Sequence, residues 1–420
     1  MTLLADLLAT IFERSRAEEG AEDAGGMSAE ELTTALMTDK GEAAGFALAA
    51  RLLSRYAAMD EAGKHRFFRH LIDGMDIDAA ALAEAVAAYQ TAPTKEAYRA
   101  VMEAAEPPRQ EFVRRLNRAP GATARLVAMR ADLRRLSAKD PDLGRADLDF
   151  RHLFSSWFNR GFLVLRPIDW TSPASILEKI IAYEAVHEIE SWDDLRRRLA
   201  PEDRRCFAFF HPAMPDEPLI FVEVALTSGV PGSIAALLAE DRAPTSALKA
   251  DTAVFYSISN CQDGLAGISF GNLLIKQVAE DLGHALPQLK TYVTLSPIPG
   301  LSAWLEEIGQ AGAKGDRLRE LGADYLLNAK RPDGSPRDPV ARFHLANGAV
   351  VHVLHADGDT SARGLKQSGG AMVNYLYDLP RISENQESHA ARGPVAASKP
   401  VRTLAEAGAK LRQPKAPKNG

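Results

Sequence analysis

The chain has 420 residues but only two cysteines, Cys206 and Cys261. Two cysteines cannot form a disulfide framework, and these two lack the paired spacing of a zinc site. We therefore expect a protein of a reducing compartment, and we predict a cytoplasmic location. The sequence favours a nucleophilic role for neither cysteine, because Cys206 lies in an apolar run and no partner that would lower the pKa of Cys261 is evident.

Long apolar runs and a positive net charge are also missing. No stretch approaches the roughly 20 apolar residues of a membrane-spanning helix, and the amino terminus lacks the basic region of a secretory signal. The formal net charge is −6 at pH 7, whereas general nucleic-acid binders usually have a basic balance. The sequence therefore predicts no membrane partner and no nucleic-acid partner.

The first third of the chain is rich in Ala, Leu, Glu and Arg and poor in β-branched residues. Apolar side chains recur there at helical spacing, as at Phe46, Leu52, Leu53 and Tyr56. The sequence Ser28–Glu31 is typical of a capping box that opens a helix. We therefore predict an all-helical domain over residues 1–145.

From residue 146 onward, β-branched and aromatic runs alternate with helical spacing. This pattern predicts an α/β domain over 146–385, and hence an α+β protein overall. The runs Arg205–His211 and Leu219–Leu226 predict a hairpin, and the Asn-Gly pair within Arg342–Leu354 predicts a second one. Residues 386–420, rich in Ala, Pro, Lys and Gly, predict a disordered tail.

The most informative segment runs from Phe255 to Leu282. It predicts a strand, a glycine-bearing turn and an amphipathic helix, and a further strand follows at Thr291–Leu295. A strand that enters a helix through such a turn directs free backbone N–H groups and the helix dipole at one point, which favours an anion. The glycines match neither the dinucleotide fingerprint nor the Walker pattern. We therefore predict a phosphate-bearing ligand of another kind at residues 266–272.

Two polar residues are candidates for chemistry. Ser296 ends the strand before Pro297, where its hydroxyl serves either as a cap or as an active-site donor; no GxSxG elbow surrounds it. His344, in the predicted second hairpin, is either a satisfied core histidine or an acid/base. A metal site is disfavoured, because His352 and His355 lie three apart on one strand and so face opposite ways.

Six ordered segments resemble the malonyl-CoA decarboxylase family, and together they span roughly residues 150–385. They are His211–Leu226, Phe255–Ser259, Gly271–Lys276, Leu295–Gly300, Phe343–Val350 and Asn374–Tyr377. The resemblance implies a helical amino-terminal domain used in self-association, and hence a homo-oligomer. It also implies a catalytic domain of the N-acetyltransferase superfamily (GNAT-like) fold.

In that fold, two parallel strands separate, and the turn after the first strand holds the pyrophosphate of coenzyme A. By resemblance, the turn consists of Ala266, Gly267, Ile268, Ser269, Phe270, Gly271 and Asn272. The superfamily often has Gln or Arg where this chain has Ala266, and Gly where it has Ser269. These departures concern details of the turn.

The resemblance implies that malonyl-CoA is converted to acetyl-CoA and carbon dioxide through a thioester enolate. Ser296 and His344 match the catalytic serine and histidine of the family, and Tyr377 matches a tyrosine near them. The expected reaction uses no metal and no cofactor, since coenzyme A is part of the substrate. Two alternatives share the ligand: a coenzyme A-dependent acyltransferase and a non-catalytic acyl-CoA sensor.

Overall fold

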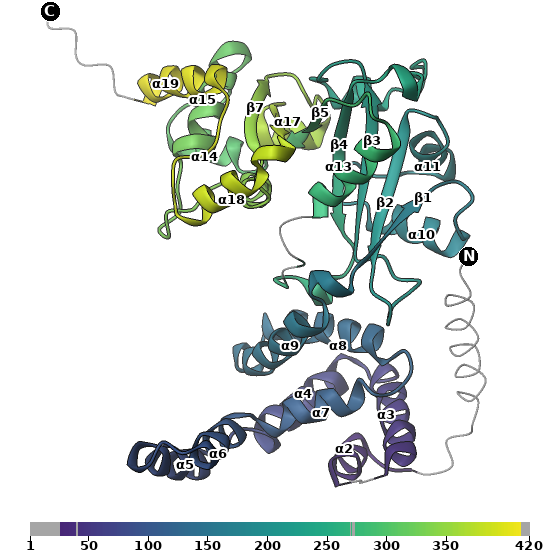
Figure 1. Ribbon diagram of the computed structural model, residues 1–420, viewed down its shortest axis with the longest axis vertical. Helices are drawn as coiled ribbons and strands as arrows, with labels where there is room; N and C mark the ends of the chain where they lie inside the picture. Colours follow the sequence, from purple (N-terminus) through teal and green to yellow (C-terminus); the bar gives the residue numbers. More distant parts are fainter. Residues whose placement is uncertain (1–25, 39–40, 269, 271–273, 413–420) are drawn as a thin grey trace, which may run out of the picture. The chain divides into compact units, whose positions relative to one another are not determined.

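The computed structural model describes residues 26–38, 41–268, 270 and 274–412. Within these ranges, no helix has the length and hydropathy needed to cross a membrane. The chain forms two compact units. The first extends to Leu163 and takes in His211–Glu217 and Gln262–Ser269, and the second holds the remainder. The units are drawn in Figure 1.

The first unit is helical, as the sequence predicts. Its α-helices are α2 (Ala29–Thr38), α3 (Glu42–Ala57), α4 (Glu61–Gly74), α5 (Ala79–Thr91), α6 (Lys95–Ala105), α7 (Pro108–Leu116), α8 (Ala122–Ser137) and α9 (Gly144–Trp157). The capping box before α2 is confirmed: the Ser28 amide donates to Glu31 Oε2 at 2.6 Å, and the Glu31 amide donates to Ser28 Oγ at 3.1 Å. The predicted boundary at residue 145 falls inside α9, and the whole of this helix belongs to the helical unit, where it packs against α4, α7 and α8.

The second unit is built on one mixed sheet. Its strands are β1 (Val164–Ile168), β2 (Arg204–Phe210), β3 (Ile220–Thr227), β4 (Thr252–Asn260), β5 (Thr291–Thr294), β6 (Ser296–Pro297), β7 (Val350–His355) and β8 (Met372–Leu376). Strands β1 to β4 are antiparallel in chain order, so the predicted β2–β3 hairpin is confirmed. Strand β5 runs parallel to β4, and β8 pairs antiparallel with β5, β6 and β7.

The parallel β4–β5 pair separates along its length. Pairing covers four positions, from Thr252 opposite Thr291 to Phe255 opposite Thr294. Beyond that point, β4 continues to Asn260 and pairs with β3. The helix that connects the two strands is α13 (Leu274–Ala285). This separation of parallel strands is the feature that the resemblance implies for the catalytic domain.

Helices cover the sheet. Helices α10 (Ala174–Tyr183) and α11 (Trp192–Leu199) pack on one face, where Ile180 and Leu195 join a buried cluster with Ala208 of β2 (Figure 1). The remaining α-helices of this unit are α12 (Ile234–Leu238), α14 (Leu301–Glu307), α15 (Gly315–Asn328), α16 (Pro339–Ala346), α17 (Ala362–Ser368), α18 (Ile382–Ala390) and α19 (Lys399–Arg412).

The second predicted hairpin is wrong, because its first half is helix α16. Asp338 caps this helix through the Ala341 amide at 2.9 Å, and Pro339 occupies its first turn. Gly348 adopts a left-handed φ of 81°, and the Ala349 amide donates to the His344 carbonyl at 3.0 Å. An Asn-Gly pair serves a helix end as well as a hairpin turn, since both need a positive φ. His344 therefore lies in the last turn of a helix.

The predicted disordered tail is wrong over residues 386–412, and residues 413–420 lie outside the described part. Helix α19 lies beside α15, with Val401, Ala405 and Gly408 buried (Figure 1). Arg412 forms an ion pair with the fully buried carboxylate of Asp324, with Nε 2.6 Å from Oδ2, and its Nη2 donates to Oδ1 at 3.3 Å. The composition of this segment resembles that of a linker, but one apolar stripe is enough to anchor an amphipathic helix on a neighbour.

Candidate active site

Ser296, His344 and Tyr377 meet in the second unit. The Oγ atom of Ser296 lies 3.1 Å from His344 Nε2, and the hydroxyl of Tyr377 lies 2.8 Å from His344 Nδ1. The sheet places the serine and the tyrosine, because Ser296 pairs with Val373 and the Tyr377 amide donates to the Tyr292 carbonyl at 2.8 Å. Ser296 and Tyr377 lie 48 and 33 positions from His344 in the sequence, and both contact its imidazole.

The hydrogen bonds of the three side chains form one directed chain. Ser296 Oγ donates to Thr294 Oγ1 at 2.8 Å. With its own hydrogen used there, Ser296 Oγ is free to accept from His344 Nε2. The Tyr377 hydroxyl then donates to Nδ1, which is the unprotonated nitrogen of a neutral imidazole. This pattern assigns the Nε2–H tautomer to His344, with its proton directed at the serine oxygen.

The imidazole is buried: His344 is 3% exposed. Burial lowers the pKa of His344 to about 3, because a charged ring is poorly solvated there. Burial likewise raises the pKa of the Tyr377 hydroxyl well above its usual value. In the free protein at neutral pH, the histidine and the tyrosine are therefore both uncharged.

Sequence reasoning missed three residues around this chain. Thr294 holds the serine hydroxyl, and it also accepts from the Tyr375 amide at 3.1 Å. The Tyr375 ring stacks on His344 with centroids 4.5 Å apart. The Tyr375 hydroxyl and Oδ2 of Asp338, which caps α16, are buried without a hydrogen-bond partner among the described residues. Only Thr294 left a signal, since side chains two apart on a strand point the same way.

The predicted coenzyme A turn is described in part. Ser269, Gly271 and Asn272 lie outside the described residues. Ile268 and Phe270 are buried, and Gly267 has a left-handed φ of 77°. The Ala266 carbonyl accepts from Arg130 Nη1 at 3.1 Å. The assignment of residues 266–272 to coenzyme A therefore remains a prediction.

The other residues weighed from the sequence occupy ordinary positions. Cys206 and Cys261 are buried, and burial raises the pKa of the Cys206 thiol. His355 Nε2 lies 2.6 Å from Asn374 Oδ1, which accounts for one ring nitrogen. Across the described part of the chain, no three His, Cys, Asp or Glu residues are grouped so that they could hold a metal ion.

Comparison with known protein families gives two matches that together cover most of the chain. The malonyl-CoA decarboxylase C-terminal domain matches residues 161–316 and 310–416, and the malonyl-CoA decarboxylase N-terminal domain matches residues 76–158. The mitochondrial malonyl-CoA decarboxylase of Anser anser anser is 35% identical over 338 residues, which is 68% of this chain and 67% of the relative. The mitochondrial malonyl-CoA decarboxylase of Mus musculus is 32% identical over 342 residues, which is 69% of this chain and 69% of the relative.

Solved structures agree with these matches. The crystal structure of malonyl-CoA decarboxylase from Rhodopseudomonas palustris has a TM-score of 0.84 at 50% identity and covers 90% of this chain and 100% of its own. The crystal structure of the Agrobacterium vitis malonyl-CoA decarboxylase has a TM-score of 0.85 with the same identity and coverage.

Proposed function

Because this chain belongs to the malonyl-CoA decarboxylase family, we propose that Ser296, His344 and Tyr377 carry its reaction. The protein is a carboxy-lyase that converts malonyl-CoA to acetyl-CoA and carbon dioxide. The observation that supports the proposed site is the hydrogen-bonded chain from Tyr377 through His344 to Ser296.

The reaction sets two demands on the site. When the malonyl carboxylate leaves as carbon dioxide, its bonding electron pair forms a thioester enolate, and negative charge grows on the thioester oxygen. The α-carbon must then take up one proton to give the acetyl group. A donor aimed in advance at the developing charge can contribute about 3–4 kcal/mol, and a positioned acid about 10²–10⁴-fold in rate.

Ser296 is suited to the first demand. Its hydroxyl donates to Thr294 in the free protein, and a rotation about the Cβ–Oγ bond would redirect that hydrogen to the substrate carboxylate or enolate oxygen. The Nε2–H of His344 would keep donating to Ser296 Oγ during this change, which strengthens the hydroxyl as a donor. Tyr377, hydrogen-bonded to the other ring nitrogen, would hold the imidazole in its orientation towards Ser296.

His344 is suited to the second demand. The imidazole is neutral when the site is empty, because burial lowers its pKa to about 3. A bound malonyl carboxylate adds a negative charge beside the ring and raises the pKa of the imidazole. In the protonated ring, Nδ1 donates to the Tyr377 hydroxyl. Nε2 would pass its proton to Ser296 Oγ while the serine hydroxyl proton moves to the α-carbon, and a proton from solvent would restore the ring.

The experiment that tests this proposal measures acetyl-CoA and carbon dioxide released from malonyl-CoA by Ser296→Ala and His344→Ala. We expect turnover to fall at least about 100-fold while the circular dichroism spectrum and cooperative unfolding are retained. Near-normal turnover in a folded variant would contradict the assignment. Release of acetyl-CoA without any acceptor also separates a decarboxylase from an acyltransferase and from a silent acyl-CoA sensor.

We propose in addition that the helical unit mediates homo-oligomerisation. Neither α5 nor α6 contains a buried residue, and Tyr98 and Met102 of α6 are 55% and 56% exposed. Light scattering should give a smaller particle mass for the double variant Tyr98→Glu/Met102→Glu than for the wild type. The control Lys366→Glu changes an exposed residue of the second unit and should keep the wild-type mass. Equal masses for all three would contradict this use of α6. The proposed cytoplasmic location is tested by cell fractionation.

A further inference from the structure

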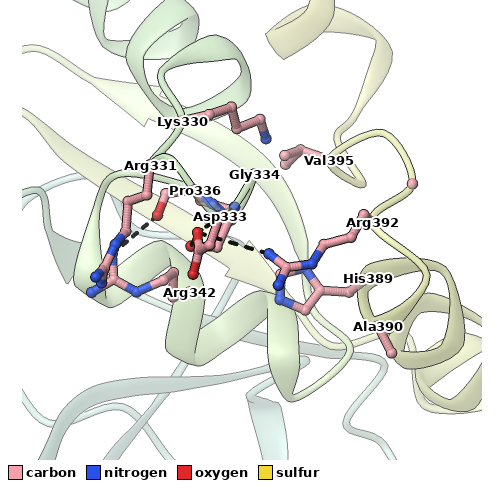
Figure 2. Close-up of a pocket in the computed structure, with 12 residues that line it drawn as sticks. Lys330, Arg331, Asp333, Gly334, Pro336, Arg342, His389, Ala390, Arg392 and Val395 are labelled. Atoms are coloured by element: carbon pink, nitrogen blue, oxygen red, sulfur yellow. Dashed lines mark hydrogen bonds and ion pairs between the residues drawn. The ribbon is translucent and has the colours of Figure 1, made fainter.

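The second unit contains a cavity that the decarboxylation chemistry does not use. The segment between α15 and α16 forms one wall, and the end of α18 with the residues after it forms the other (Figure 2). Its volume is about 350 Å³, which lies in the range of small-molecule sites. The charged and titratable side chains that line it are Lys330, Arg331, Asp333, Arg342, His389 and Arg392.

The charges in this cavity are unbalanced. Four of the lining side chains are cationic and one is a carboxylate, although the whole chain has a net charge of −6. The carboxylate of Asp333 accepts from the amide and hydroxyl of Ser335 at 2.9 and 2.6 Å. Its distance to Arg392 is 3.8 Å, with both side chains 55% exposed, and such a pair contributes little. The single lining carboxylate therefore compensates only part of the positive charge in the cavity.

Two local observations agree with this imbalance. Burial, and then the charges of Lys330 and Arg392, lower the pKa of His389. Arg392 is the one non-glycine residue with a positive φ, 58°, in the described part of the chain. A side chain held in this left-handed region is under backbone strain, and such residues cluster at ligand sites.

Donor groups are available in the cavity. Arg342 Nη1 donates to the carbonyls of Pro336 and Arg337 at 3.0 and 2.8 Å, which fixes the guanidinium in the wall. Its Nε and Nη2, and the ammonium group of Lys330, have no hydrogen-bond partner among the described residues. A planar guanidinium matches the oxygen atoms of a phosphoryl group, and an ammonium supplies a further point charge.

We propose that this cavity binds a phosphoryl group. The group belongs either to the 3′-phosphate end of the coenzyme A substrate, a source that rests on the proposed function, or to a separate phosphorylated metabolite. The site is coupled to the reaction through α16, which carries Arg342 on one face and His344 on another. Helix α18 reinforces this connection, since Asn385 and Gln386 donate to carbonyls of Gly348 and Ala346 at 3.0 and 3.3 Å.

Binding is tested directly with inorganic phosphate by titration calorimetry, at an ionic strength held constant with chloride. The variant Lys330→Gln/Arg392→Gln removes two charges and keeps similar side-chain size. The control Lys366→Gln/Arg402→Gln removes two exposed charges elsewhere in the same unit. We expect saturable binding to the wild type and the control, and at least tenfold weaker binding to the cavity variant. Absent saturation, or equal affinity in all three proteins, would overturn the proposal.

The source of the phosphoryl group is identified by comparing malonyl-CoA with its 3′-dephospho analogue. If the substrate supplies the group, the cavity variant raises KM for malonyl-CoA but not for the 3′-dephospho analogue. Inorganic phosphate then competes with malonyl-CoA. If a separate metabolite supplies it, KM is unchanged and phosphate alters kcat of the wild type. Phosphate that does neither would overturn a role in this enzyme. Absence of decarboxylation by the wild type would contradict the proposed function. Calorimetry would still test whether the cavity binds phosphate.

Discussion

The Nδ1 atom of His344 and the hydroxyl of Tyr377 lie 2.8 Å apart, and this contact, together with the Ser296–Thr294 hydrogen bond, assigns the ring proton to Nε2. A tyrosine hydroxyl that donates to Nδ1 leaves the hydrogen of the neutral ring on Nε2, facing Ser296. The tyrosine therefore acts as a positioning residue in the proposed mechanism, through the histidine.

Replacing Tyr377 by Phe should lower kcat about tenfold with little change in KM, because one hydrogen bond of about 1–1.5 kcal/mol no longer holds the tautomer. The matched control is Tyr256→Phe, since the Tyr256 hydroxyl is buried in the same unit without a hydrogen-bond partner among the described residues. Steady-state kinetics on both variants measures the difference. Equal kcat values for the two would argue against a positioning role for Tyr377.

The stability of the protein in acid should depend on His344. The folded pKa of about 3 lies below the usual value of about 6.5, so the unfolded chain binds a proton that the folded state refuses. The stability from this group is complete above pH 6.5 and is lost as the pH falls towards 3, by about 1.4 kcal/mol per pH unit. His344→Gln should show a shallower decline in denaturant unfolding over this window, and a curve parallel to the wild type would contradict the neutral buried state.

Glu223 should affect stability in the opposite direction. Its carboxyl is fully buried on β3, and burial together with the charge of Glu184 raises its pKa to about 8. The folded state therefore binds a proton that the unfolded chain releases, so stability falls as the pH rises from about 4.5 to 8. Glu223→Gln keeps the shape without the ionisation. In denaturant unfolding, we expect this variant to be about 4 kcal/mol more stable than the wild type at pH 8, with the difference vanishing as the pH falls to about 4.5.

The last described turn of α19 should contribute to the stability of the second unit. Arg412 is the cation on the fully buried carboxylate of Asp324, whose other described partner is the Asn328 amide at 2.8 Å. Arg412→Met would leave that charge unpaired, and we expect a loss of about 2–4 kcal/mol in the free energy of unfolding. The control Arg402→Met removes an exposed arginine of the same helix and should cost less than about 0.5 kcal/mol. Equal stabilities would show that Asp324 tolerates the loss.

Much of the architecture could be predicted because the relevant signals are local. Alternating and continuous apolar runs identified β2, β3, β4 and β5, and helical spacing identified the first unit. By resemblance, the order of six short segments points to Ser296, His344 and Tyr377 from the sequence alone. Each of these signals lies within one short stretch of the chain, and tertiary packing did not alter the elements that they predict.

Packing between distant segments decided the remainder. The Asn347-Gly348 pair allows a hairpin turn or a helix end with equal ease, and the cap by Asp338 selected the helix that presents His344 to Ser296. A tail with the composition of a linker became α19, because its apolar stripe found α15. The neutral state of His344 likewise follows from burial among side chains far away in sequence. The residues alone were enough to establish the family and most of the elements, whereas helices α16 and α19, the protonation state and the alignment of the site come from contacts that form only when the chain is folded.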